Sequence, residues 1–461
     1  MSNVITLLYI IAFALFIYGL MGLTGPRTAV RGNWIAATGM GVAIIATLLT
    51  PHLSNWLLII LGVALGTLVG IPSARQVKMT AMPQMVALFN GVGGGAVALI
   101  AWVEFRDLHG YAGQPAYVPV TSLFAAIIGS LSFWGSLVAY GKLQEILPGR
   151  PISVGKYQQP LNFGLLAAAV ACAVAIGVGV DSQLLIIGLL VFAAALGLMT
   201  VFPIGGADMP VVISLLNACT GLSAAATGLA LNNTALIVAG MIVGASGSIL
   251  TNLMAKAMNR SIPAIVAGGF GGVTVAADSG SVGDKTVRQT SAADAAIQMA
   301  YANQVVVVPG YGMAVAQAQH AVREMASLLE SRGVEVKYAI HPVAGRMPGH
   351  MNVLLAEADV PYEQLREMDD INGEFSRTDV ALVIGANDVT NPAAHTNPGS
   401  PIYGMPILNV DQARSIIVLK RSMNSGFAGI ENELFYDPKT TMLFGDAKSS
   451  VNTVSEELKA L

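Results

Sequence analysis

The sequence has little charge and almost no cysteine. Only 11% of its 461 residues are charged and two are cysteines, whereas about a quarter of the residues of globular proteins are charged. Cys172 and Cys219 lie in apolar runs without the spacing of metal ligands, so we interpret them as packed side chains and expect no metal site. The net charge of −3 comes without a basic stripe, so nothing indicates nucleic-acid binding.

The few charges are unevenly distributed. Residues 1–262 contain ten Lys or Arg and five Asp or Glu, whereas the remaining 199 residues contain fourteen Lys or Arg and 22 Asp or Glu. The first part therefore has the composition of a membrane protein and the second that of a soluble domain. We expect a transmembrane domain at 1–262, a linker at 263–290 and a soluble domain at 291–461.

Apolar runs of about 20 residues are typical of helices that cross a bilayer. Nine such runs predict nine transmembrane helices, at Val4–Leu23, Trp34–Leu49, Trp56–Ile71, Met82–Val103, Ser122–Tyr140, Phe163–Val180, Leu184–Phe202, Met209–Ala230 and Leu236–Met258. The first run lacks a basic region before it and a small-residue cleavage site after it, which favours a retained span over a signal peptide.

The loops between these runs predict the orientation. Alternate loops carry Arg27, Arg31, Arg75, Lys78, Lys142, Arg150, Lys156, Lys256 and Arg260, and the opposite set carries only Arg106. Because positive charge stays on the cytoplasmic side, we expect an outer N-terminus and a cytosolic C-terminal domain.

Three polar residues of the membrane domain have two interpretations each. Asp208 precedes Met209-Pro210 at the cytoplasmic mouth of the eighth span, where it would cap the helix or act as a gate. Asn90 and Asn217 lie inside the fourth and eighth spans. Each would either hold helices together or provide a polar step in an ion path. No histidine falls inside a predicted span.

The segment after the ninth span is rich in Gly, Ser and Asp. It includes Gly268-Gly269-Phe270-Gly271-Gly272 and Asp278-Ser279-Gly280-Ser281. Such composition is typical of a flexible connector, which would suit either a movable joint or a passive tether.

Beyond residue 291 the pattern alternates between strands and helices, which predicts a Rossmann-like α/β domain with a parallel sheet. The buried strand 305–308 runs into Gly310, Gly312 and Val315, then into a helix to about Arg332 and a second strand at Val334–Ile340. This order is the context that a dinucleotide-binding glycine turn requires, with the pyrophosphate near a helix N-terminus. The third position holds Val315 in place of the usual glycine, so a turn without a ligand is the alternative to nucleotide binding.

The charge at two strand ends favours NADP over NAD. The second strand runs out through Ala339-Ile340-His341-Pro342, without the carboxylate that holds the ribose 2′-hydroxyl of NAD. The strand Ser415–Leu419 is followed instead by Lys420, Arg421 and Ser422, which can hold a 2′-phosphate. An exposed basic pair without a ligand is the alternative.

Further segments border strand-like stretches, where a doubly wound sheet places its ligands. They are 343–348, 385–388 and 445–448. Within the second, Asp388 would be a turn residue or a titratable group near the nucleotide.

Six motifs together resemble one family. The segments are GADMP at 206–210, GYGMAVAQAQ at 310–319, HPVAGRMPGH at 341–350, GAND at 385–388, KRSMN at 420–424 and GDAK at 445–448. They are similar to the β subunit of bacterial proton-translocating NAD(P) transhydrogenase, and the resemblance covers essentially the whole chain.

The resemblance implies that this chain binds NADP(H) and supplies part of a proton channel. The implied cofactor contacts are Gly310, Tyr311, Gly312, Val315, Val343, Ala344, Gly345, Arg346, Met347, Pro348, Gly385, Ala386, Asn387, Asp388, Val389, Lys420, Arg421, Ser422, Met423, Asn424, Ser425, Gly426, Phe427, Asp446 and Ala447. Lys420, Arg421 and Ser422 would take the 2′-phosphate, and residues 427–436 would form a lid. The implied proton path and its coupling involve Asn90, Asp208, Asn217 and Asp388.

The resemblance also implies partners and a location. A separate α subunit would bind NAD(H) and add further spans, αβ units would pair into a dimer, and the complex would lie in the bacterial inner membrane. Some family members have a histidine for proton transfer in the fourth span, where this chain has Asn90. Because Asn cannot titrate, the protonatable group must then lie elsewhere, either on the α subunit or as bound water.

The implied reaction is direct hydride transfer between NAD(H) and NADP(H), coupled to proton translocation. Such a transfer needs two nicotinamide rings held in near-attack geometry and no catalytic side chain. An ion channel or transporter regulated by a nucleotide-sensing domain is the alternative of another class. A membrane-anchored dehydrogenase would need a second catalytic domain, for which no residues remain.

Overall fold

The computed structural model describes residues 2–461, except for 24, 52, 54, 79–80, 149–150, 206–207, 259–260, 267–285, 346–348, 401 and 427–428. The chain divides into two compact units. The membrane unit comprises Met1–Ile204 and Val212–Thr251, and the C-terminal unit comprises Gly205–Val211 and Asn252–Leu461. The predicted linker lies mostly outside the described residues.

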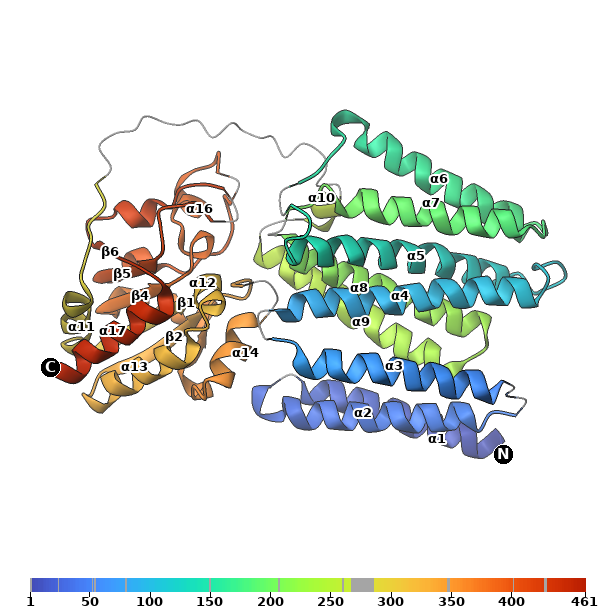
Figure 1. Ribbon diagram of the computed structural model, residues 1–461, viewed down its shortest axis with the longest axis horizontal. Coiled ribbons are helices and arrows are strands. Elements are labelled where there is room, and N and C mark those ends of the chain that lie inside the picture. Colours follow the sequence, from blue (N-terminus) through green and yellow to red (C-terminus); the bar gives the residue numbers. More distant parts are fainter. Residues whose placement is uncertain are drawn as a thin grey trace. The chain divides into compact units, whose positions relative to one another are not determined.

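Within the described residues, nine helices are long and apolar enough to cross a membrane, which confirms the predicted polytopic helical fold (Figure 1). They are α1 (Ser2–Gly22), α2 (Pro26–Leu48), α3 (Trp56–Gln76), α4 (Met82–Asp107), α5 (Tyr117–Leu143), α6 (Gln158–Gly177), α7 (Gln183–Val201), α8 (Met209–Ala230) and α9 (Thr234–Ala257). A short helix α10 (Ile262–Val266) follows.

Several helices extend beyond the apolar runs that predict them. Helix α4 continues to Asp107 and α5 begins at Tyr117, because helical hydrogen bonding continues where the hydropathy signal ends. The predicted loop position of Lys142 was wrong: Lys142 lies in the last turn of α5 and is 3% exposed.

Helices α4 and α5 pack almost backbone to backbone. A Cβ atom added to Gly94 would lie 2.9 Å from the Gly129 carbonyl oxygen, and one added to Gly129 would lie 2.7 Å from that of Gly94. Small residues permit such close approach between membrane helices. This contact therefore leaves no room for side chains or water between the two helices at this level.

The C-terminal unit contains a six-stranded parallel sheet, which confirms the predicted Rossmann-like fold. The strands are β1 (Gln304–Pro309), β2 (Glu335–Ile340), β3 (Leu365–Glu367), β4 (Val380–Ile384), β5 (Ser415–Lys420) and β6 (Thr440–Phe444). Their order is β3-β2-β1-β4-β5-β6, so the strand order reverses between β1 and β4, where doubly wound sheets bind ligands.

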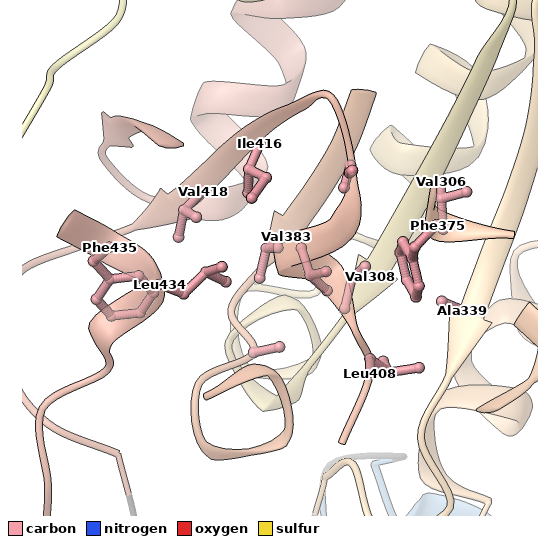
Figure 2. Packing of buried hydrophobic residues seen from close by; sticks show 14 of the residues in the cluster. Val306, Val308, Ala339, Phe375, Val383, Leu408, Ile416, Val418, Leu434 and Phe435 are labelled. Carbon is pink, nitrogen blue, oxygen red and sulfur yellow. The ribbon is translucent and has the colours of Figure 1, made fainter. Parts of the chain in front are cut away.

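Both faces of the sheet are covered, because its central strands are apolar on both sides. The helices are α11 (Ala292–Ala300), α12 (Tyr311–Val315), α13 (Gln319–Ser331), α14 (His350–Glu357), α15 (Met368–Ile371), α16 (Ala393–Thr396) and α17 (Ala447–Ala460). Figure 2 shows alternate residues of β1, β4 and β5, including Val308, Val383 and Val418, packed with Leu434 and Phe435. The residues that hold the sheet together thus also anchor the segment around 434–435.

The described end of the predicted linker lies along the sheet. The N–H of Met442 in β6 donates to the Arg288 carbonyl oxygen at 2.7 Å, and the N–H of Thr290 donates to that of Met442 at 3.0 Å. Gln289 forms an isolated parallel bridge with Met442. The chain is therefore tied to the sheet from residue 288 onward.

Candidate functional site

The candidate nucleotide site lies at the carboxyl edge of the parallel sheet. Because all strands run in the same direction, the loops that follow β1, β2, β4, β5 and β6 meet at one edge. Those loops begin at Gly310, His341, Gly385, Arg421 and Gly445. The structure thus brings together the five segments that the sequence selects as cofactor-binding.

The glycine turn after β1 packs directly on the loop after β4. Gly310 donates its N–H to the Ile384 carbonyl oxygen at 2.9 Å, and Gly312 donates to that of Gly385 at 3.0 Å. A Cβ atom on Gly310 would collide with Ala386, and one on Gly312 would lie 2.7 Å from the Gly385 Cα. The glycine turn and the loop that begins at Gly385 therefore meet backbone to backbone, as close approach to a phosphorylated ligand requires.

The helix after the glycine turn is broken, and its prediction as one continuous helix was wrong. Helix α12 ends at Val315, and Gln317 has a φ of 49°. The N–H of Ala318 donates to the Met313 carbonyl oxygen and that of Gln317 to Ala314, each at 3.1 Å. This pair of bonds is a Schellman cap, which ends α12 before α13 begins at Gln319.

The loop after β2 is organised by two buried histidines. His341 Nε2 donates to the Pro406 carbonyl oxygen at 2.8 Å, and its Nδ1 accepts from the Val343 N–H at 3.2 Å. Burial lowers the pKa of His341, against the opposing effect of the bond to Pro406, so the ring is held neutral. Gly345, with a φ of 104°, packs its backbone against His350.

The ring of Tyr311 lies 6.5 Å from that of His350, which connects the loop after β2 with the turn after β1. Ala344 is buried beside this turn, with its N–H donated to the His341 carbonyl oxygen at 3.0 Å. Arg346, Met347 and Pro348 lie outside the described residues. The described part of the loop therefore reaches Tyr311, the first residue of α12.

The loop after β4 carries a carboxylate toward the segment that follows β5. Asp388 begins a tight turn, with its carbonyl oxygen accepting from the Asn391 N–H at 3.2 Å. A Cβ atom on Gly426 would lie 2.6 Å from Asp388 Oδ1 and 2.8 Å from Asn387 Nδ2. Asp388 is thus a turn residue whose carboxylate packs against the Gly426 backbone.

Lys420 at the end of β5 is held over an aromatic ring. Its Nζ lies 4.6 Å from the ring centroid of Phe435, a cation–π distance, and it donates to the Asn424 carbonyl oxygen. Burial lowers the pKa of Lys420, and the negative charge of Asp388 raises it. The ammonium group is therefore fixed in position and electrostatically coupled to Asp388.

The side chains after Lys420 are open to solvent. Arg421, Ser422, Met423, Asn424 and Ser425 are exposed. Among the described residues, the side chains of Arg421 and Ser422 have no hydrogen-bond or ion-pair partner, so both are free to contact a ligand. Phe427 lies outside the described residues.

Asn432 ties the segment after Gly426 to the loop after β4. Its Nδ2 donates to Asn387 O at 3.0 Å and Asn387 Oδ1 at 3.2 Å, and the residue is 2% exposed. In the other direction, Asn391 Nδ2 donates to the Glu431 carbonyl oxygen at 2.9 Å. Residues 431–432 are therefore pinned to the loop that contains Asp388.

The last loop ends in a helix cap. Asp446 Oδ1 accepts from the N–H groups of Lys448 and Ser449, at 3.1 and 3.2 Å, at the start of α17. Ala447 is buried in the first turn of that helix. The structure thus gives Asp446 a capping role at the same sheet edge.

Polar side chains also form a network inside the membrane unit. Asn90 Nδ2 of α4 donates to Ser136 Oγ at 2.9 Å and lies 3.4 Å from Ser132 Oγ, both on α5. Ser132 in turn bonds Thr220 Oγ1 of α8 at 2.5 Å and donates to the Leu216 carbonyl oxygen at 3.0 Å. The network thus joins three helices.

Asn217, the second polar residue predicted inside a span, does not join that network. The residue is partly buried in α8, and its side chain makes no hydrogen bond within the described part of the chain. Asp208 directly precedes α8, is 9% exposed and belongs to the C-terminal unit. Among the described residues, the structure therefore does not join Asn90 and Asn217 through hydrogen bonds.

Sequence reasoning missed the contacts of two residues. One is Asn432, which it placed in the lid 427–436 without assigning it a hydrogen-bond role. The other is Lys142, whose Nζ donates to the carbonyl oxygens of Phe202 and Ile204 at 2.6 and 2.7 Å. A cation next to an apolar run could have suggested a helix-end contact for Lys142, but the contact of Asn432 with Asn387 joins distant segments. The described residues contain no cluster of three metal-ligating side chains.

Known proteins resemble this chain over nearly its whole length. The model of a family described as NAD(P) transhydrogenase beta subunit matches residues 5–457. Two relatives from Rhodospirillum rubrum, each named NAD(P) transhydrogenase subunit beta, are 48% identical to it over 456 residues, which is 98% of this chain and 98% of each relative.

Proposed function

The chain belongs to the NAD(P) transhydrogenase beta-subunit family, and from this premise we propose that it binds NADP(H) and forms part of a proton channel. As a member it is a multi-pass membrane subunit of an enzyme that uses nicotinamide nucleotides. A beta subunit implies an alpha-subunit partner. We assign NAD(H) binding and additional spans to that partner, and we expect two αβ units to form a dimer.

The proposed reaction is NADH + NADP⁺ ⇌ NAD⁺ + NADPH, with protons moving inward when NADPH is formed. The hydride passes directly between two nicotinamides, so the chain's residues bind, orient and exclude water. No side-chain acid or base is required in this step. The proton gradient then supplies the drive toward NADPH, because the two redox couples have nearly equal potentials.

The observation that carries the proposal is the joined backbone surface of Gly310, Gly312 and Gly385 beside Lys420. Strand β4 separates β1 from β5. A nucleotide that reaches from the glycine turn to Lys420 must therefore cross the end of β4, where the small residues Gly385 and Ala386 lie. Lys420, Arg421 and Ser422 would hold the 2′-phosphate, since cations and a hydroxyl group favour that dianion.

Binding measurements test the cofactor assignment. Titration of the reconstituted protein with NADP⁺ and with NAD⁺ should show a clear preference for NADP⁺. Each charge-assisted hydrogen bond contributes about 1.5–3 kcal/mol, so Lys420→Ala and Arg421→Ala should each weaken NADP⁺ binding by about 10- to 100-fold and leave NAD⁺ binding unchanged. Arg414→Ala is the matched control, because Arg414 precedes β5 and pairs with Asp379 at 2.8 Å. Equal affinity for both nucleotides in every variant would refute the assignment.

We assign the chain to the bacterial inner membrane, with an outer N-terminus and a cytosolic C-terminal unit. The support is the distribution of Lys and Arg over the loops. In this orientation Asp208 lies at the cytosolic mouth of the channel. Accessibility of single cysteines placed in the α4–α5 and α5–α6 loops to an impermeant reagent tests it, since only the former should react from outside.

The coupling hypothesis links protonation near Asp208 and Asn217 to the nucleotide loop that contains Asp388. Its motivation is that one carboxylate lies at the channel mouth and the other packs against Gly426 after β5. Asp208→Asn should reduce both proton translocation and coupled turnover. Retention of both activities in this variant would remove Asp208 from the mechanism.

A further inference from the structure

The end of α4 carries a carboxylate that belongs to a chain of hydrogen bonds. The hydroxyl group of Tyr111 donates to Ser122 Oγ at 2.6 Å, and Ser122 Oγ donates to Glu104 Oε2 at 3.0 Å. Tyr111 is 4% exposed and Ser122 is 1% exposed. The apolar run that predicts this span ends at Val103, so the sequence does not place Glu104 in the helix, although it lies within α4.

The packing around Tyr111 fixes the direction of this chain. Its ring contacts that of Phe105 edge to face, with 5.6 Å between centroids. Burial raises the pKa of Tyr111 to about 12, the hydrogen bond with Ser122 opposes this rise, and the charge of Glu104 adds to it. Tyr111 therefore stays protonated and donates its hydrogen bond to Ser122, and Ser122 donates its own hydrogen bond to Glu104. The Glu104 carboxylate is the last acceptor in this series of hydrogen bonds.

Other charged and titratable groups at this end lie in the last turn of α4 and in the two loops that flank α5 and α7. A pocket of about 600 Å³ is lined by Arg106, Asp107, His109, Asp181 and Gln183, contributed by the end of α4, the loop before α5 and the segment at the start of α7. Tyr117 at the start of α5 is exposed. Glu104 is itself partly exposed and lies two residues before Arg106 on α4, so water and hydronium ions reach this end of the helix.

The Glu104 chain is separate from the inner network around Asn90. Between the two, α4 and α5 meet at Gly94 and Gly129, where each backbone contacts the other. Buried Ala98, Ala101 and Ala125 continue this apolar contact. A proton held at Glu104 thus cannot pass directly between α4 and α5 to Asn90. Glu104 is therefore a protonatable site separate from the inner network.

We propose that Glu104 is the proton-loading site of this subunit on the outer side of the membrane, with Ser122 and Tyr111 as positioning residues. The inference rests on the proposed function and extends it. In the loading step a proton leaves an external hydronium ion, which becomes water, and forms an O–H bond on the Glu104 carboxylate. This step neutralises the charge of Glu104, and Ser122 continues to hold Oε2. Because Asn90 cannot titrate, Glu104 supplies a protonatable group that the inner network lacks.

The test uses the complete complex with its alpha subunit in proteoliposomes. NADPH formation driven by a proton gradient is measured. The pH is varied on the side of the membrane that Glu104 faces and is kept fixed on the side of the nucleotide unit. Glu104→Gln keeps an oxygen that accepts from Ser122 but cannot titrate, so it separates proton loading from helix packing. We expect at least a tenfold lower proton-driven rate, no remaining dependence on external pH, and unchanged NADP⁺ binding. Asp107→Asn is the matched control, because it removes an exposed carboxylate at the same end and should keep the wild-type profile.

A second measurement covers the case in which Glu104→Gln does not assemble. Infrared difference spectra of the wild-type complex, recorded between two external pH values, should contain the carbonyl band of a protonated carboxyl group, and Ser122→Ala should shift its midpoint. A wild-type pH profile in Glu104→Gln, or the absence of any such band in the wild type, would overturn the inference. If the wild-type complex moves no protons at all, the proposed function fails instead.

Discussion

The N–H of Gly312 lies 3.0 Å from the carbonyl oxygen of Gly385 and donates to it. This bond joins the turn after β1 to the loop after β4, at the point where the strand order reverses. A side chain on either glycine would push the two loops apart. The nucleotide site that we propose depends on this contact between two backbones.

Gly312→Ala is expected to weaken NADP(H) binding at least tenfold. The new Cβ atom would lie 2.7 Å from the Gly385 Cα, and such overpacking typically costs about 1–3 kcal/mol. Calorimetric titration with NADP⁺ measures the effect. Gly373→Ala is the control, since the nearest atom to its Cβ lies 3.9 Å away. Wild-type affinity in Gly312→Ala would show that the two loops can separate without consequence.

Asn432→Ala is expected to speed the release of NADP(H). The substitution removes both hydrogen bonds to Asn387 from a buried site, where loss of a partner costs about 1–3 kcal/mol. Stopped-flow measurement of the dissociation rate should show about a 10-fold increase. Asn452→Ala on the exposed face of α17 serves as the control, and equal release rates in the two variants would argue against a role of residues 431–432 in holding the lid.

The stability of the C-terminal unit is expected to fall as the pH decreases below about 6.5, the ordinary pKa of histidine. Burial lowers the pKa of folded His341, so the unfolded chain binds a proton more readily and stability is lost as the pH falls. Glu374 adds a second loss at lower pH: burial raises its pKa, but hydrogen bonds from Lys337, Arg377 and Gln304 bring it down to about 2.

Thermal unfolding of wild type and His341→Gln separates these contributions. Between pH 7.5 and pH 5.5 the wild type should lose more stability than the variant, whose amide does not titrate. Both proteins should then lose stability alike below the ordinary pKa of glutamate, about 4.3. An identical decrease in both proteins across the first interval would contradict the role of His341.

The two membrane asparagines are expected to behave differently. Asn90→Leu should lower thermal stability as well as proton translocation, because it removes the hydrogen bond to Ser136. Asn217→Leu should leave stability unchanged, since the Asn217 side chain has no hydrogen-bond partner in the described part of the chain, and should still reduce proton translocation about tenfold. Normal proton translocation in Asn217→Leu would remove this residue from the path.

The sequence predicts the helical membrane fold and the parallel sheet well, because long apolar runs and strand–helix alternation are local signals. It also places Gly310, Gly385 and Lys420 at strand ends, which the parallel topology then brings to one edge. Strand β3, with only three residues, and the left-handed Gln317 carry no comparable local signal.

The contacts of Asn432 and Glu104 could not be predicted for another reason. Asn432 and Asn387 are 45 positions apart, and nothing in either segment indicates that an amide will bridge them. Glu104 lies one residue beyond an apolar run, where hydropathy cannot decide between loop and helix. Its partner Ser122 becomes apparent only when α4 and α5 are packed together.

The central claim is that this chain joins NADP(H) binding to proton movement. Proteoliposomes that contain it with its alpha subunit should therefore transfer hydride from NADPH to an NAD⁺ analogue, while protons move across the membrane away from the side of the nucleotide unit. Hydride transfer and proton movement should both stop when Lys420 and Arg421 are replaced by alanine. Ion flux that responds to NADPH without hydride transfer, or hydride transfer without any proton movement in a sealed vesicle, would contradict the account.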